Sequence, residues 1–176
     1  MRRVRYVVAM SLDGYIAGPN GEADWIIMDP DIDFRALFEQ FDTFLLGRRT
    51  FEAIGGARGG GQAGLKTLVF SRTLRQQDYP NVTIVSEDPE RVLADLRAKP
   101  GKDIWLFGGG SLFRSLLEAR LVDAVEVSVI PVLLGEGIPL LPTKPSSKRF
   151  KLKLASSRTF ETGIVSLAYA VEYEPA

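Results

Sequence analysis

Short apolar blocks alternate with amphipathic ones along the chain, and this pattern predicts strands and helices in succession. Apolar runs typical of buried strands occupy residues 4–10, 43–47, 66–71, 82–86 and 104–107. Apolar residues recur at helical spacing in residues 31–41, 48–54 and 88–99, and again from Ser111 onward. The alternation favours an α/β fold with a largely parallel sheet.

The last third of the chain has a different pattern. Longer, partly alternating segments at residues 123–135, 150–160 and 164–174 predict antiparallel strands that complete the same sheet, with a turn at residues 161–163. Residues 11–25 and 140–149 are rich in glycine, proline or serine and are expected to be loops. Without a repeat or a linker, residues 1–176 are predicted to form a single domain.

Composition removes several kinds of chemistry. Lys+Arg and Asp+Glu both total 22, so no net charge draws the protein to nucleic acid or to a membrane surface. The chain has no His and no Cys, which excludes a Ser-His-Asp triad, a thiol nucleophile and a His- or Cys-based metal site. A general acid or base must then be a carboxylate, Lys or Tyr, unless a cofactor carries the reaction.

The amino-terminal apolar run is too short for a signal peptide, and no segment has the length of a membrane span. We therefore expect a cytoplasmic protein without a metal, a membrane partner or a nucleic-acid partner.

The strongest candidate site is the glycine run Gly108–Gly109–Gly110, followed by Ser111. It lies between the carboxyl end of a strand and the start of a helix, where α/β folds bind ligands and where free N–H groups favour phosphate. The alternative is a tight turn without a ligand. A second run, Gly59 to Gly61, has no helix behind it and is predicted to be a surface loop, although Arg58 beside it could contact a cofactor.

Two other strands are also followed by basic residues. Gly47 precedes Arg48, Arg49 and Thr50, where two cations at a helix start are unfavourable unless an anion neutralises them. Ser71 and Arg72 follow another strand, and an arginine there can bind a 2′-phosphate. The alternative for each pair is an ordinary solvated surface charge.

Acidic and aromatic residues precede the first predicted helix. Asp13 lies in a probable Asp-Gly turn, and Asp29, Asp31 and Asp33 could cap the helix or act in a site. Trp25 and Phe34 are candidate substrate contacts, with core packing as the alternative.

Taken together, the segments "MSLDGYIAGPNGEADWI", "FDTFLLGRRTFEAI", "LVFSRTL" and "WLFGGGSLFRSLLEARLVDAVEVSVIPVLLGEGIPLL" resemble the dihydrofolate reductase-like superfamily. The resemblance is to the reductase domain of bifunctional riboflavin-biosynthesis deaminase-reductases and its stand-alone relatives. It covers nearly the whole chain. It implies a three-layer α/β fold with a mostly parallel sheet of about eight strands, with NADPH lying across the strand ends.

The resemblance also implies roles for individual residues. Ala9 and Ile16 would meet the nicotinamide, and Ser71 and Arg72 would bind the adenosine 2′-phosphate. The remaining phosphates would be held by Gly47, Arg48, Thr50, Gly108, Gly109, Gly110, Ser111 and Leu112. A carboxylate from Asp13, Asp31 or Asp33 would anchor the substrate or relay a proton.

Two departures narrow the implied function. The deaminase half of the bifunctional enzymes needs a His/Cys zinc site, which this chain cannot form. Phe107 stands where riboflavin-type reductases commonly have an acid.

The resemblance implies an NADPH-dependent oxidoreductase that reduces a heterocycle, foremost 5-amino-6-(5-phosphoribosylamino)uracil. Pterin reduction and a non-catalytic NADPH-binding sensor are the alternatives, and the apolar residues 127–141 suggest a homodimer.

Overall fold

The computed structural model describes residues 1–56, 64–144 and 148–174. Its strands are β1 (Val4–Ser11), β2 (Tyr15–Ala17), β3 (Phe41–Gly47), β4 (Lys66–Phe70), β5 (Thr83–Val85), β6 (Asp103–Gly108), β7 (Ala124–Ile130), β8 (Ile138–Pro139), β9 (Lys151–Thr159) and β10 (Val165–Glu172). Its helices are α1 (Phe34–Phe38), α2 (Arg48–Ala53), α3 (Pro89–Ala98) and α4 (Gly110–Glu118), with a 3-10 turn, η2 (Gln76–Asp78). Arg58 and Gly59 to Gly61 lie outside the described residues, so the predicted loop there stays a prediction.

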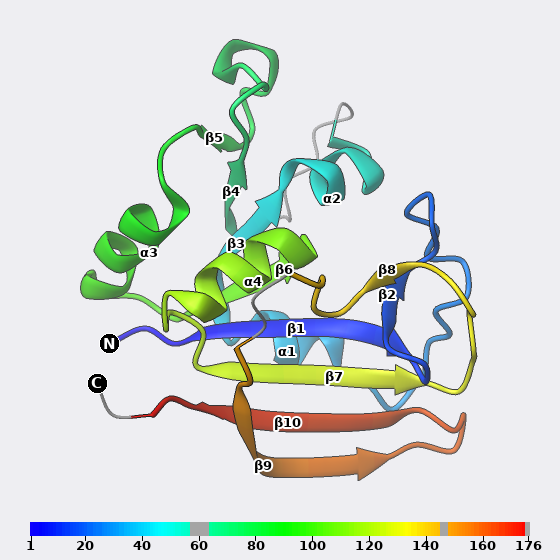
Figure 1. Cartoon of the computed structure of the whole chain (residues 1–176). Coiled ribbons are helices and arrows are strands. Elements are labelled where there is room, and N and C mark those ends of the chain that lie inside the picture. The colour runs from blue at the N-terminus through cyan, green and yellow to red at the C-terminus, as the bar shows by residue number, and fades with distance from the viewer. Residues whose placement is uncertain (57–63, 145–147, 175–176) are drawn as a thin grey trace.

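Eight strands form one sheet in the order β5-β4-β3-β6-β1-β7-β10-β9. Strands β5, β4, β3, β6, β1 and β7 are parallel neighbours, and β10 is antiparallel to both β7 and β9. The predicted α/β fold, with a mostly parallel sheet and antiparallel carboxyl-terminal strands, is confirmed. Because the parallel strands run together, their carboxyl ends meet at one edge of the sheet (Figure 1).

Helices cover both faces of the sheet and create two separate cores. Helices α3 and α4 pack on one face, where Tyr6 stacks on Phe113 with 3.9 Å between ring centroids. Helices α1 and α2 contribute to the other face, an aromatic core centred on Trp105. Figure 1 shows α4 in front of the sheet and α1 behind it. None of the helices in the described part of the chain is long and apolar enough to cross a membrane.

The first predicted helix is shorter than its sequence pattern indicates. Helical spacing over residues 31–41 predicted about three turns, whereas α1 spans only Phe34–Phe38. Phe41 instead begins β3, where it is buried against Trp105 with 5.0 Å between ring centroids. Burial of this ring in the sheet outweighs the weak helical propensity of a short segment.

A small two-stranded sheet was not predicted. Strands β2 and β8 pair antiparallel. Strand β2 lies in a segment expected to be loop, β8 lies between the predicted strand 123–135 and the predicted loop 140–149, and both are too short to leave a pattern in the sequence. The strand predicted over residues 123–135 ends at Ile130, since Pro131 has no N–H with which to continue the ladder.

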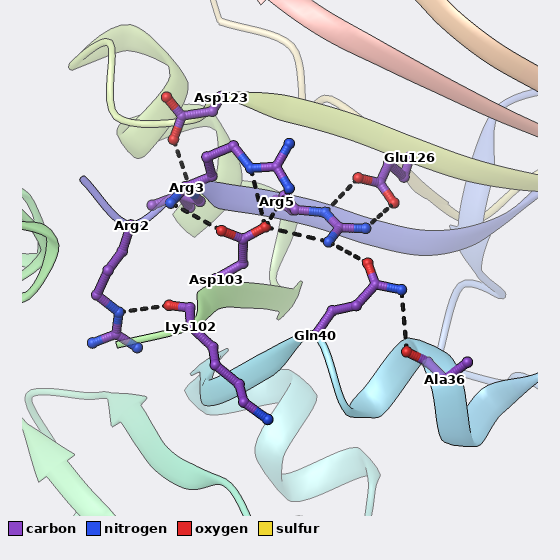
Figure 2. Close-up of polar contacts among 10 residues, drawn as sticks. Arg2, Arg3, Arg5, Ala36, Gln40, Lys102, Asp103, Asp123 and Glu126 are labelled. Atoms are coloured by element: carbon purple, nitrogen blue, oxygen red, sulfur yellow. Dashed lines mark hydrogen bonds and ion pairs between the residues drawn. The ribbon is translucent and has the colours of Figure 1, made fainter. Parts of the chain in front are cut away.

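Near the amino-terminal edge of the sheet, a charged network joins β1 to its neighbours. The Arg5 guanidinium donates to both Glu126 carboxylate oxygens at 2.6 and 2.8 Å, and to Gln40 at 2.7 Å. Arg3 and Arg5 both pair with Asp103 on β6 (Figure 2). The Arg5 side chain is 8% exposed and that of Arg3 is 63% exposed. The buried arginine therefore holds β1, β6, β7 and the segment after α1 in register.

Replacing Arg5 by Met should lower the free energy of unfolding by about 3 kcal/mol, because it leaves two partly buried carboxylates without their buried partner. Arg3→Met is the matched control on the same strand and should cost no more than about 1 kcal/mol, as expected for an exposed pair. Urea unfolding of the three proteins checks this. Equal losses in the two variants would contradict the assigned role of Arg5.

Candidate functional site at the carboxyl edge of the sheet

The sheet opens between β1 and β6 before it reaches its carboxyl edge. The parallel ladder between these strands ends at Tyr6 and Leu106. Beyond that point β1 continues to pair with β7 as far as Ser11, while β6 pairs only with β3, through Gly108. The two central strands therefore separate at the edge where open α/β sheets bind ligands.

The backbone of β1 faces this opening. The N–H of Ile104 on β6 donates to the carbonyl of Arg3, and the N–H of Asp123 before β7 donates to the carbonyl of Val4. The backbone N–H and C=O groups of odd-numbered residues of β1 therefore point toward β6. The indole of Trp105 donates to the carbonyl of Val7 at 3.0 Å in place of a ladder partner. By the same alternation, the N–H and C=O groups of Ala9 point into the opened region. The resemblance implies a nicotinamide contact at Ala9.

Glycines line the other side of the opening. Gly109 has φ +103°, which favours glycine, and a Cβ there would lie 3.4 Å from the Cα of Gly47. A Cβ on Gly108 would lie 2.7 Å from Cγ2 of Thr50, and one on Gly110 would lie 2.8 Å from Cγ of Pro142. The ends of β3 and β6 are therefore packed backbone to backbone. The predicted residues Gly47, Thr50 and Gly108 to Gly110 are brought together.

Helix α4 begins directly after this turn. Its cap residue, Gly109, supplies no side-chain hydrogen bond. The N–H groups of the first turn and the positive end of the helix dipole therefore suit an anionic group. Ser111 is exposed there, whereas the Leu112 side chain is buried in the core between α4 and the sheet. Only the backbone of Leu112 is thus available to a ligand.

The predicted arginines lie after β3 and β4. Arg48 is exposed and pairs with Glu52 at 3.8 Å. Arg49 and Arg72 are exposed and have no ion pair among the described residues. Ser71 is buried, and its hydroxyl accepts from the N–H groups of Thr73 and Leu74 at 3.2 and 3.0 Å. Its side chain therefore caps its own turn, and the exposed charge at this strand end belongs to Arg72.

Asp13 is bound to a distant segment of the chain. Its carboxylate accepts from the Ser11 hydroxyl at 2.6 Å and from the N–H groups of Leu134 and Gly135 at 3.1 and 2.7 Å. The Ser11 hydrogen bond, followed by those of the two backbone N–H groups, lowers the pKa of Asp13. The carboxylate holds residues 134–135 beside the end of β1.

The other predicted substrate-side residues lie on or beside the segment before α1. Asp33 caps α1 by accepting from the N–H of Ala36 at 2.9 Å. Asp31 is exposed, and no described group donates to its carboxylate. The indole of Trp25 donates to the carbonyl of Glu22 at 3.0 Å. Ile16 on β2, Trp25 and Phe34 are half-buried.

Phe107 lies on β6 beyond the last residue pair with β1, and its ring packs against the aromatic core. It lies at the end of β6, half-buried, with its ring centroid 4.7 Å from that of Phe44. It cannot supply the acid that the resemblance implies at this position. Within the described residues, no group of three or more acidic side chains is arranged to hold a metal ion.

The family model for the RibD C-terminal domain matches residues 2–166. The chain belongs to the RibD C-terminal domain family. It is also 39% identical over 180 residues to the uncharacterized protein YyaP of Bacillus subtilis (strain 168), a match that covers 96% of this chain and 94% of that protein. The family is of the reductase type and belongs to riboflavin biosynthesis.

Solved structures support the same fold. A putative riboflavin biosynthesis protein from Shewanella sp. PV-4 matches with TM-score 0.79 and 27% identity, over 98% of this chain and all of that one. A deaminase/5-amino-6-(5-phosphoribosylamino)uracil reductase from Thermotoga maritima matches with TM-score 0.70 and 18% identity. That match covers 96% of this chain and 56% of the Thermotoga chain. The predicted dihydrofolate reductase-like fold is confirmed.

Several features of the site could not be read from the sequence. The bond of Trp105 to the Val7 carbonyl depends on where a ladder ends. The backbone partners of Asp13 at residues 134–135 lie more than a hundred positions away. Asp29 was predicted to cap the helix or to act in a site, and its burial and its bond to Thr162 could not be read from a local pattern.

Gly108→Ala should destabilise the fold by about 1–3 kcal/mol, because the new methyl group would overlap Cγ2 of Thr50. Thr50→Ser removes that methyl group, and the double variant should recover part of the loss. Chemical unfolding of the two single variants and the double variant tests the contact. Strictly additive losses would show that the two groups do not meet.

Asp13→Asn should weaken the fold at neutral pH and have little effect in acid. A carboxylate whose folded pKa is lowered contributes stability above its unfolded pKa, about 3.9, and this contribution is lost as the pH falls through the lower folded value. Urea midpoints of wild type and variant should therefore differ at neutral pH and converge in strong acid. Asp24→Asn, at another exposed aspartate before α1, serves as control and should leave the urea midpoint at neutral pH unchanged.

Proposed function

We propose that the chain is an NADPH-dependent reductase that acts on a heterocyclic substrate, foremost a ribosylamino-pyrimidine. The observation that carries the proposal is the opened sheet edge, with the Ala9 backbone on one side and the Gly47–Gly109 contact on the other. Reductases of this family use NADPH. The family match and the structure of the riboflavin biosynthesis protein from Shewanella support the same class of reaction.

The residues at this edge fit NADPH in three respects. Gly109 has no side chain, so the start of α4 and the backbone of Gly47 can lie close together, and the uncapped first turn of α4 suits a pyrophosphate. Arg72 offers a guanidinium to a 2′-phosphate beyond β4. The Ala9 N–H and C=O groups match the donor and acceptor of a carboxamide. When bound, NADPH would supply the hydride.

The protein's own contribution is to orient the reactants and exclude water. Phe107 provides an apolar surface beside the opening, and Ile16 and Trp25 are half-buried side chains on the segments after β1. Of the three candidate carboxylates, Asp13 and Asp33 already bind backbone N–H groups. Asp31 is therefore our choice for the group that accepts a hydrogen bond from the substrate or relays a proton to it.

The direct test is equilibrium binding of NADPH, followed by loss of nicotinamide absorbance with 5-amino-6-(5-phosphoribosylamino)uracil and with dihydrofolate. Turnover of the pyrimidine supports the proposal, and turnover of dihydrofolate alone assigns the chain to pterin reduction. Tight NADPH binding without turnover favours the sensor, which the replacement of an acid by Phe107 would suit. Failure to bind NADPH overturns all three.

A homodimer is a further part of the proposal. Residues 127–141 suggested an exposed apolar contact, but Val127 and Ile130 are buried within the chain. Leu133, which is 68% exposed, is the large apolar side chain of this segment that an interface could cover.

Arg72→Ala should weaken NADPH binding by about tenfold or more, the loss of one hydrogen bond to a charged group. NADH has no 2′-phosphate, so its affinity should change by less than about twofold on the same reasoning. Fluorescence titration with both nucleotides measures this. Lys66→Ala, at the opposite end of β4, is the control, and equal losses for both nucleotides would remove the role given to Arg72.

A further inference from the structure

The segment of residues 18–33 connects β2 to α1 and carries the substrate-side residues Trp25 and Asp31. Its internal shape is set by short-range bonds. Gly18 donates to the carbonyl of Glu22 at 2.8 Å, and Ile32 donates to that of Asp29 at 3.1 Å. These bonds form turns within the segment. They do not determine where the segment lies on the protein.

One polar contact supplies that placement. The Thr162 hydroxyl donates to Oδ2 of Asp29 at 2.7 Å, and the Thr162 N–H donates to the same oxygen at 3.3 Å. The other oxygen, Oδ1, accepts from the N–H of Asp31 at 2.9 Å. Among the described residues, the two bonds from Thr162 are the only hydrogen bonds that join residues 18–33 to anything beyond α1.

The carboxylate of Asp29 is buried and depends on its hydrogen-bond donors. Asp29 is 4% exposed and is the one carboxylate among the buried charged residues of the described chain. Asp29 forms no ion pair among the described residues, and the hydrogen-bond donors to its carboxylate are neutral groups. The Thr162 hydroxyl, together with the N–H of Asp31, lowers the pKa of Asp29 and keeps it ionised at neutral pH. A buried charge is costly when its donors are removed.

Neither of the two apolar cores includes a residue of this segment. Trp25, Ile26 and Ile32 are half-buried, whereas Ile27 and Met28, which precede Asp29, are 42% and 62% exposed. The partner is itself firmly held. The turn of Thr162 is closed by hydrogen bonds between Phe160, Gly163 and Ile164, and Gly163 lies against Pro131 at the end of β7. The β9–β10 turn is thus a fixed point to which the segment is tied.

We propose that Asp29 and Thr162 form a latch that positions residues 18–33 for the substrate. They are positioning residues, because they act through Trp25 and Asp31 rather than on the reacting atoms. This inference rests on the proposed reductase function for its effect on catalysis. The latch also gives the β9–β10 hairpin, whose outer strand β9 is exposed throughout, a part in the site.

The placement itself is tested by hydrogen–deuterium exchange of residues 18–33, which requires no substrate. Asp29→Asn and Thr162→Val should each accelerate exchange there by about tenfold, the effect expected for losing a hydrogen bond to a charged group. Thr162→Ser keeps the hydroxyl and should exchange like wild type. Glu161→Gln, the exposed neighbour of Thr162, is the control for a lost charge. Unchanged exchange in Asp29→Asn and Thr162→Val would overturn the latch.

The catalytic consequence is tested by steady-state kinetics on the same proteins. Thr162→Val should raise KM for the heterocyclic acceptor by about tenfold and leave kcat and the Kd of NADPH within about twofold, while Thr162→Ser restores KM. An equal rise in the Kd of NADPH, or no rescue by Ser, would overturn the positioning role. If wild type turns over neither acceptor, the proposed function fails, and the exchange result alone decides the latch.

Discussion

The early end of the ladder between β1 and β6 is the constraint on which the candidate site depends. If the ladder continued beyond Tyr6 and Leu106, the backbone N–H and C=O groups of Ala9 would form sheet hydrogen bonds and could not bind a ligand. Residues 107–110 would then lie directly beside β1. Trp105 satisfies the Val7 carbonyl at the point of separation, so the opening leaves no orphaned acceptor there. At the opposite edge, the Arg5 network keeps the same strands together.

Side-chain carboxylates tie two segments near the carboxyl edge of the sheet to distant parts of the chain. Asp13 binds residues 134–135, and Asp29 binds the β9–β10 turn. Both bonds go to neutral donors, so both carboxylates keep their full charge beside the site. The cofactor side has the opposite character, with exposed arginines after β3 and β4. A nicotinamide nucleotide, anionic at its phosphates and neutral at its ring, matches this division of charge.

The sequence predicted the fold, and it indicated the carboxyl edge of the sheet as the candidate site, because both depend on local patterns. Strand and helix periodicity, and glycines or arginines directly after strands, are visible in a short window of residues. Phe41 was assigned to a helix because the apolar residues before it have helical spacing. Its burial beside Trp105 is a tertiary effect that the local pattern does not reveal. Ser71 resembled a ligand contact, but its hydroxyl caps a turn. The bonds of Asp13 to residues 134–135 and of Asp29 to Thr162 join residues more than a hundred positions apart, and no local pattern specifies such partners.

The separation between Asp29 and Thr162 has a consequence for how the protein assembles. The two residues are 133 positions apart, and the second lies in the turn between the last two strands. The bond can form only after β7, β10 and β9 have joined the sheet, so it belongs to the slow, non-local part of folding. The substrate side should therefore be the last region to acquire its native order. The opened edge of the parallel sheet would then be in place before the segment that carries Asp31.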